Sequence, residues 1–206
     1  MQKSVLVWAV RSAVVAVVTA GAAGAVIKGS PGDATAQAAP GYEYRVLATA
    51  KTSTMEKELN DGAEAGFRFQ AVMGGETAGG SEVVVVMVRS SEANARVAYR
   101  LLATSKTSTM EAELRAAAEA GFEYRGQTVF KSAFGGQEVV CILERDASAG
   151  PIQSTYRVVA TTKTSTLQKE LQTAGAAGYL LMGITVGKTA MGGNELVGIL
   201  RRAEKP

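Results

Sequence analysis

The chain has 206 residues, 47% of them hydrophobic, which is enough for the packed core of one or two ordinary domains. It contains no histidine and a single cysteine, Cys141, which argues against zinc sites of the usual Cys/His kinds and against a thiol nucleophile with a histidine base. The formal net charge is +3, but beyond residue 38 basic and acidic side chains nearly balance, and the basic stripe that nucleic-acid binding requires is missing.

Residues 1–38 have the pattern of an export signal. Lys3 and Arg11 provide a positive start, residues 12–27 are mostly small and apolar, and a small-x-small motif ends at Ala38. The apolar run is shorter than the ~20 residues that cross a bilayer comfortably. We therefore expect a periplasmic or secreted protein that is cleaved after Ala38. The alternative is that the segment is retained as a membrane anchor.

Beyond this segment the sequence consists of three tandem copies of one unit of about fifty residues, a length typical of repeat proteins. We place the copies at residues 42–90, 97–146 and 154–203. Each copy begins with Tyr-Arg, passes through Lys-Thr-Ser-Thr and Glu-Leu to a Gly-aromatic step, and ends with a Gly-Gly pair and an apolar run. The Tyr-Arg pairs begin at Tyr44, Tyr99 and Tyr156.

Each copy is expected to form a strand, a helix and two further strands. In the first copy, a capping box of Ser53 and Glu56 marks the start of the helix. Apolar residues then recur every four positions from Met55 to Ala63, and Gly66 is placed for a left-handed C-terminal residue. The two other copies repeat this arrangement, so they predict the same elements.

The last strand of each copy is almost continuously apolar, which favours burial on both faces. These runs are Val83–Val88, Val139–Leu143 and Leu196–Leu200. A right-handed crossover leaves room for this strand between the other two. The sequence therefore predicts an α+β fold of three β-α-β-β units, each an antiparallel sheet of order 1-3-2 with one helix.

A unit of about fifty residues buries too little surface to be stable alone. We therefore expect the bare faces of the three sheets to pack together with pseudo-threefold symmetry. The alternative is an open array.

The first copy combines the Tyr-rich start Tyr42–Val46, the Glu-Leu pair at Glu58, the Gly-aromatic step at Gly66 and the basic end at Arg89. With this pattern the unit resembles a family of short bacterial domains of unknown function. Members of that family often have Trp after the glycine, where this chain has Phe or Tyr. The resemblance implies the fold of the unit, and it implies no activity.

One edge of each unit gathers groups that could bind an anion. The first strand ends there, the helix starts there and the hairpin between the last two strands turns there. Lysine and hydroxyl groups at a helix N-terminus can hold a phosphate or a carboxylate. The candidate anion-binding residues are Lys51, Thr52, Ser53, Lys106, Thr107, Ser108, Lys131, Lys163, Thr164, Ser165 and Lys188.

A structural interpretation of the same edge is favoured. In that interpretation the hydroxyls cap the helices, and each lysine pairs with the glutamate that begins the last strand of its repeat. These glutamates are Glu82, Glu138 and Glu195.

Two function classes follow. The first is a non-catalytic binding or scaffold module of the cell envelope, with an envelope protein as its partner. The second is a small-anion binding protein or an enzyme that uses the Lys-Thr-Ser-Thr helix N-termini. We expect no catalytic residue of a known type, no cofactor, no metal and no nucleic-acid partner. Membrane contact is expected only if the N-terminal segment is retained.

Overall fold

The structure is a computed structural model, and the part of the chain that begins at residue 41 is described here by itself. The expected export segment, residues 1–38, lies outside the described residues. The described ranges are 41–91, 96–104, 107–131, 137–148, 154–188 and 193–203.

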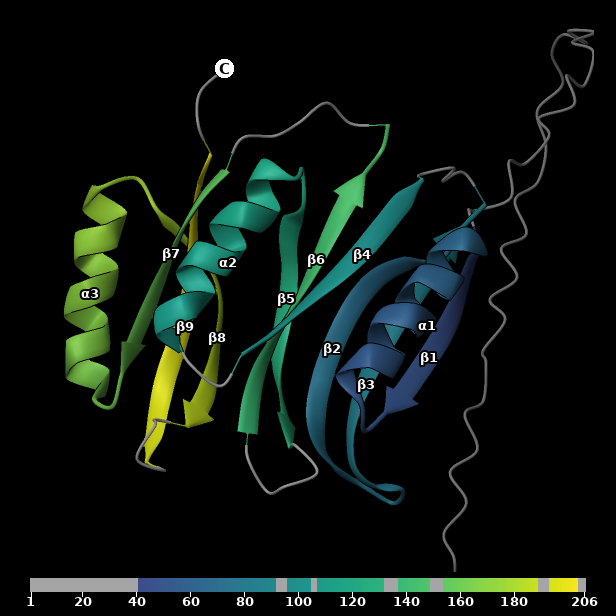
Figure 1. Ribbon diagram of the computed structural model, residues 1–206, viewed down its shortest axis with the longest axis horizontal. Helices are drawn as coiled ribbons and strands as arrows, with labels where there is room; N and C mark the ends of the chain where they lie inside the picture. The colour runs from purple at the N-terminus through teal and green to yellow at the C-terminus, as the bar shows by residue number, and fades with distance from the viewer. Residues whose placement is uncertain are drawn as a thin grey trace, which may run out of the picture. The chain divides into compact units, whose positions relative to one another are not determined.

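The three repeats have the same elements in the same order (Figure 1). Repeat 1 contains β1 (Tyr42–Thr49), α1 (Thr52–Glu64), β2 (Arg68–Thr77) and β3 (Gly80–Ser90). Repeat 2 contains β4 (Val97–Thr104), α2 (Thr107–Glu119), β5 (Glu123–Lys131) and β6 (Gln137–Asp146). Repeat 3 contains β7 (Ser154–Thr161), α3 (Thr164–Ala176), β8 (Leu180–Lys188) and β9 (Asn194–Ala203).

Each repeat forms a separate antiparallel sheet, and the orders are β1-β3-β2, β4-β6-β5 and β7-β9-β8. The predicted α+β fold and the strand order 1-3-2 are thus confirmed. The second strand of every repeat carries a register shift at the same place, for example between Phe69 and Ala71. Such a bulge leaves backbone groups outside the regular ladder, and here it becomes a contact point between repeats.

The helix of repeat 1 ends as the sequence predicts. Gly66 has a φ of +83°, and the Phe67 amide donates to the carbonyl of Gly62 at 2.9 Å. This closure uses the left-handed conformation that glycine adopts without strain. Arg45 and Arg89 lie 4.5 and 4.8 Å from the centre of the Phe67 ring, so the Gly-aromatic step is held between two guanidinium groups.

The predicted capping boxes of repeats 1 and 3 are wrong. The N-cap residues of α1 and α3 are Lys51 and Lys163, and neither helix has a side-chain cap. Instead, the Lys51 amide donates to Thr49 Oγ1 at 3.2 Å, outside the helix. Glu56, the expected second member of the box, accepts from the Leu101 amide of repeat 2 at 2.8 Å. The glutamate therefore joins two repeats and does not cap its own helix.

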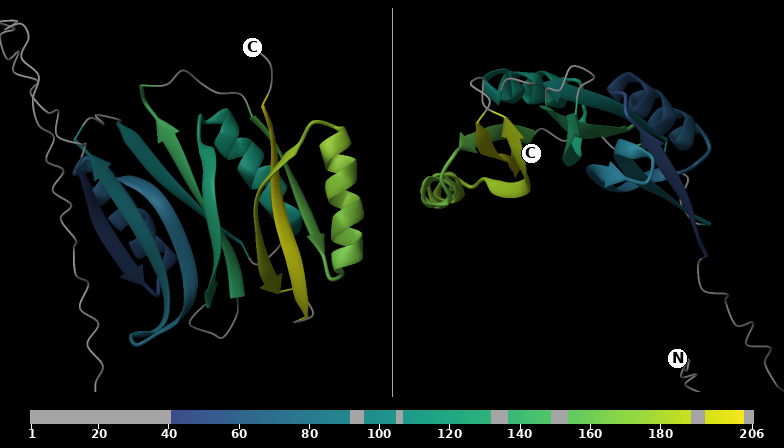
Figure 2. Two further views of the ribbon diagram at one scale, coloured as in Figure 1. Left: turned by 180° about the vertical axis from the view of Figure 1, so that it is seen from behind. Right: turned by 90° about the horizontal axis from the view of Figure 1, so that it is seen from below.

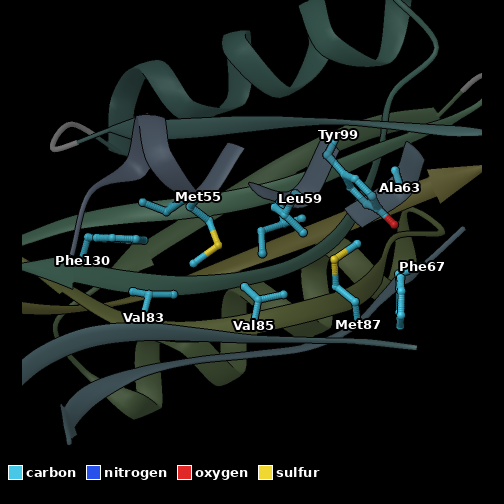
Figure 3. Packing of buried hydrophobic residues seen from close by; sticks show 11 residues of the cluster. Met55, Leu59, Ala63, Phe67, Val83, Val85, Met87, Tyr99 and Phe130 are labelled. Carbon is cyan, nitrogen blue, oxygen red and sulfur yellow. The ribbon is translucent and has the colours of Figure 1, made fainter. Parts of the chain in front are cut away.

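Each sheet has two different faces. The helix face carries the helix of the same repeat, and the bare face is the opposite one. In repeat 1, Val83, Val85 and Met87 of β3 lie on the helix face with Met55 and Leu59 of α1 (Figure 3). Alternation along a strand places Val84, Val86 and Val88 on the bare face.

The bare face of repeat 2 packs against the helix face of repeat 1, beside α1. Val140 and Ile142 of β6 belong to the same buried cluster as Met55 and Leu59, and Tyr99 of β4 enters it from the side (Figure 3). The next interface repeats this arrangement, because the bare-face residues Val197 and Ile199 of β9 lie in one cluster with Met110 and Leu114 of α2.

This packing corrects the expected pseudo-threefold body. The bare faces do not meet one another, because those of repeats 2 and 3 each lie on the helix face of the preceding repeat. Figure 2 shows the repeats following one another in chain order, which is the open array. The third cluster, around Leu167 of α3 and Leu200 of β9, contains residues of repeat 3 alone.

The open array explains how the last strands are buried. In β6 every residue from Val139 to Glu144 is buried, as expected for a strand covered on both faces. In β3 buried residues alternate with half-buried ones from Val83 to Val88, because no described repeat covers the bare face of repeat 1. None of the helices in the described ranges has the length and apolar content that a bilayer crossing requires.

Candidate functional site

The lysines at the predicted anion edge have different surroundings in the three repeats. Lys51 and Lys163 are exposed at the N-caps of α1 and α3. Lys131 forms an ion pair with Glu76 of repeat 1, and Lys188 donates to Asn194 Oδ1 at 2.7 Å within its own hairpin. Lys106 lies outside the described residues, and so does the side chain of Ser108.

The hydroxyls at this edge also differ in their exposure and partners. Thr52 is half-buried, Ser53, Thr164 and Ser165 are exposed, and Thr107 donates to Glu195 Oε1 of repeat 3 at 3.3 Å. These five side chains belong to three separate helix starts.

The expected pairing of lysines with Glu82, Glu138 and Glu195 requires correction. Glu82 accepts from Thr77 Oγ1 at 2.5 Å, and Glu195 accepts from Thr107. Neither Lys51 nor Lys163 occurs among the ion pairs of the described residues. Glu82 thus bonds within its own hairpin, and Glu195 bonds to the preceding repeat.

A pocket of about 220 Å³ lies where the β2–β3 hairpin meets β5. Its polar lining residues include Glu82, Lys131 and Gln137, and its apolar lining includes Val83 and Phe130. Because Lys131 is already paired with Glu76 and Glu82 contributes a negative charge, this pocket is a poor site for an anion.

The interfaces between repeats contain the most highly organised polar groups. The Tyr99 hydroxyl accepts from the bulge amide of Phe69 in repeat 1 at 2.7 Å and donates to Glu144 at 2.8 Å. In the next interface, the Tyr156 hydroxyl accepts from the Tyr124 amide at 2.9 Å. Burial is the largest cause that raises the pKa of Tyr99 and of Tyr156, so both stay protonated and act as fixed links between repeats.

Glu144 is the most deeply buried charged residue at these interfaces, with 1% of its surface exposed. Its Oε1 atom lies 2.6 Å from Arg68 Nη2 of repeat 1 and 2.8 Å from Arg125 Nη2 of its own repeat. The hydrogen bond to this carboxylate raises the pKa of Arg68. Both guanidinium groups thus donate to Oε1 and the Tyr99 phenol donates to Oε2, so each carboxylate oxygen is held by at least one hydrogen bond.

The helix of repeat 1 binds the outer edge of the sheet of repeat 2. Asn60 Nδ2 donates to the Tyr99 carbonyl at 3.0 Å, and Asn60 Oδ1 accepts from the Tyr99 amide at 2.9 Å. Glu56 binds the Leu101 amide on the same edge, and Glu111 of α2 binds the Val158 amide of repeat 3 at 3.0 Å. These contacts satisfy edge groups that would otherwise be free to pair with another chain.

Replacing Asn60 with alanine is expected to lower the free energy of unfolding by about 1–2 kcal/mol, because two backbone groups of β4 lose their partner. Urea denaturation of the purified protein measures this change. Replacing Gln172, which occupies the same helix position in repeat 3 and is exposed, provides the matched control and should change stability by less than about 0.5 kcal/mol. Equal losses would contradict the role given to Asn60.

The described residues offer little reactive chemistry. They contain no group of three or more His, Cys, Asp or Glu side chains that could hold a metal ion. Cys141 lies in the core between α2 and the sheet of repeat 2, fully buried. Burial, with a smaller contribution from Glu113, raises the pKa of its thiol to about 12.

Cys141 is therefore expected to resist thiol reagents at pH 8 in the native protein and to react fully in denaturant. Ellman's reagent measures both states. A cysteine introduced at exposed Ser81 in a Cys141→Ala background serves as the reactive control. Rapid labelling of native Cys141 would show that its surroundings are open.

Searches of protein-family models, curated proteins and solved structures give no match to this chain. The interface residues Asn60, Glu111 and Glu144 were missed by sequence reasoning. A signal was present for Glu111, since Glu56 and Glu111 occupy the same place in two copies, but a capping box explained that pattern without a second repeat.

Proposed function

We propose that residues 41–203 form a non-catalytic binding or scaffold module, carried by an exported protein of the cell envelope. The supporting observation is the distribution of exposed large hydrophobic side chains. In the described part of the chain they lie only on β1 and β2 of the first repeat and on β8 of the third. Apolar side chains gathered at two surfaces are typical of protein–protein contacts. These residues are Tyr42, Tyr44, Val46, Met73, Leu180, Leu181, Ile184 and Val186.

The polar groups in the interior support the same proposal. An enzyme needs a titratable group that is free to react, whereas Glu144, Tyr99 and Tyr156 are each bound to groups of a neighbouring repeat. Their role is to hold successive repeats together. The function is therefore assigned to surfaces rather than to a pocket.

Photo-crosslinking in the native host tests this proposal. A photoreactive amino acid at Val46 or at Ile184 is expected to form specific crosslinks to protein, whereas one at Lys57, exposed on α1, is not. The competing anion hypothesis predicts instead that phosphate or a carboxylate raises the melting temperature, and that this rise is lost in a Lys51→Met and Lys163→Met variant. Such a rise, with no crosslink at either end, would overturn the proposal.

A further inference from the structure

We infer that this chain binds a second copy of itself head to tail, with the bare face of repeat 1 seated on the helix face of repeat 3 of the next copy. This inference rests on the proposed binding function and names its partner. The head face consists of Tyr42, Tyr44, Val46, Met73 and Val88. The tail face consists of Leu180, Leu181, Ile184, Val186 and Gln168. The two faces belong to the first and last repeats, at opposite ends of the array (Figure 1).

The tyrosine of the first strand is the first matching element. Tyr99 and Tyr156 are 4% and 3% exposed, and each binds the bulge amide of the preceding repeat. Tyr44 has the same position in repeat 1 but is 63% exposed. The bulge amide at the same position in repeat 3 belongs to Leu181. A second copy would bring Tyr44 and the Leu181 amide together.

The bulge side chain and the small residue opposite it are the second element. The Phe69 ring lies over Gly126, since an added Cβ on this glycine would be 2.9 Å from Phe69 Cζ. In the next interface, an added Cβ on Gly183 would overlap the Tyr124 hydroxyl. The corresponding pair between copies is Leu181 and Ala71, again a large side chain opposite a small one.

The charges at the strand ends give the third and sharpest correspondence. The first interface pairs Arg68 with Glu144, and the second reverses the signs, with Glu123 Oε1 lying 3.6 Å from Arg201 Nη1. The same two positions at the free ends are Leu180 and Val88, both apolar. In all three cases the two residues are complementary: opposite charges at the two interfaces within the chain, and two apolar side chains at the free ends. Leu180 is 68% exposed, a cost that a partner carrying Val88 would remove.

The helix supplies the fourth element. Glu56 and Glu111 accept from the amides of Leu101 and Val158 in the following repeat. At this position α3 has exposed Gln168, whose side-chain oxygen can accept in the same way. The amide at the corresponding place on a second copy is that of Val46.

A repeat array normally ends in repeats with polar outer faces, which keep it soluble and stop its growth. Both terminal repeats of this chain are instead apolar on the outside. Because the head and tail faces differ, their contact is heterologous, and it produces either a closed ring or a filament. Association of this kind would build a scaffold from many copies of the same chain.

Light scattering coupled to size-exclusion chromatography tests the inference. The wild-type chain is expected to show a mass above that of one chain. Val88→Glu or Leu180→Arg should each raise the dissociation constant on the order of tenfold or more, because each places a charge against an apolar side chain of the other copy. A one-to-one mixture of the two variants should recover the association, as should the double variant. Recovery is expected because the two new charges recreate the pair formed by Arg68 and Glu144.

Two further variants keep the test decisive if Val88→Glu folds poorly. Tyr44→Phe removes only an exposed hydroxyl and should raise the dissociation constant about fivefold. Ala112→Glu adds a charge on exposed α2 and should change nothing. Circular dichroism melting confirms folding of each variant.

A chain that stays monomeric up to millimolar concentration would overturn the inference. So would oligomers that are insensitive to both charge variants, or a mixture that fails to recover. If the purified chain is monomeric while Val46 and Ile184 crosslink to a different protein in cells, the inference fails and the proposed binding function stands.

Discussion

Replacing Glu144 with alanine is expected to lower the free energy of unfolding by about 3 kcal/mol, at the lower end of the cost of breaking a buried ion pair. The carboxylate is 1% exposed, whereas the side chains of Arg68 and Arg125 are 40% and 36% exposed. Without the carboxylate, these two like charges face each other at the interface. Water can reach both guanidinium groups, which keeps the cost from being larger.

Urea or thermal denaturation measures this loss, with Glu43→Ala as the matched control. Glu43 pairs with Arg89, but both side chains are largely exposed, so the control should lose less than about 1 kcal/mol. A Glu144 variant as stable as the control would show that Glu144 does not join repeats 1 and 2.

Replacing Leu59 with alanine is expected to cost about 3–4 kcal/mol, within the range for a buried leucine. Leu59 is fully buried, because α1 contacts its own sheet and β4, and the sheet of repeat 2 completes the cluster around it. Leu171 has the same position on α3 but is only half-buried, in a cluster that repeat 3 forms alone. We expect Leu171→Ala to cost about 1.5 kcal/mol, since a half-buried side chain removes less apolar surface from water.

The comparison uses identical chemistry at two equivalent positions, so the difference reports the surroundings of the helix. Chemical denaturation of both variants measures this difference in the free energy of unfolding. Equal losses would mean that α1 and α3 are covered to the same extent, as in a closed pseudo-threefold body.

The fold of one unit could be predicted because its determinants are local. The stripe from Met55 to Ala63, the glycine at Gly66 and the apolar run from Val83 to Val88 each act within about fifty residues. Because the crossover is short and each sheet has three strands, one strand order is favoured. The internal repetition supported each of these expectations three times.

The packing between units could not be predicted in the same way. The alternation of side chains along a strand shows which residues share a face of the sheet. Which face packs against a neighbouring repeat depends on how the chain positions that repeat. Glu56 shows the difficulty, because its local pattern fits a helix cap while its actual partner is the Leu101 amide of another repeat. Glu144 is similar, since its two arginine partners lie 76 and 19 residues away in the sequence.

The sequences of the three copies also do not show how the repeats differ in exposure. Tyr44, Tyr99 and Tyr156 each precede an arginine and two aliphatic residues, yet the first is exposed and the other two are buried because of their places in the array. The identity of repeats predicted a shared fold correctly. It could not show that the first and last units present unpaired faces.

Hydroxyl-radical footprinting of these three tyrosines tests the open array most directly. At a concentration where the protein is monomeric, the account predicts rapid modification of Tyr44 and strong protection of Tyr99 and Tyr156. As the concentration rises, Tyr44 should become protected as the head face is covered. Equal protection of all three tyrosines in the monomer would contradict the open array, because it would require the head face to be buried within a single chain.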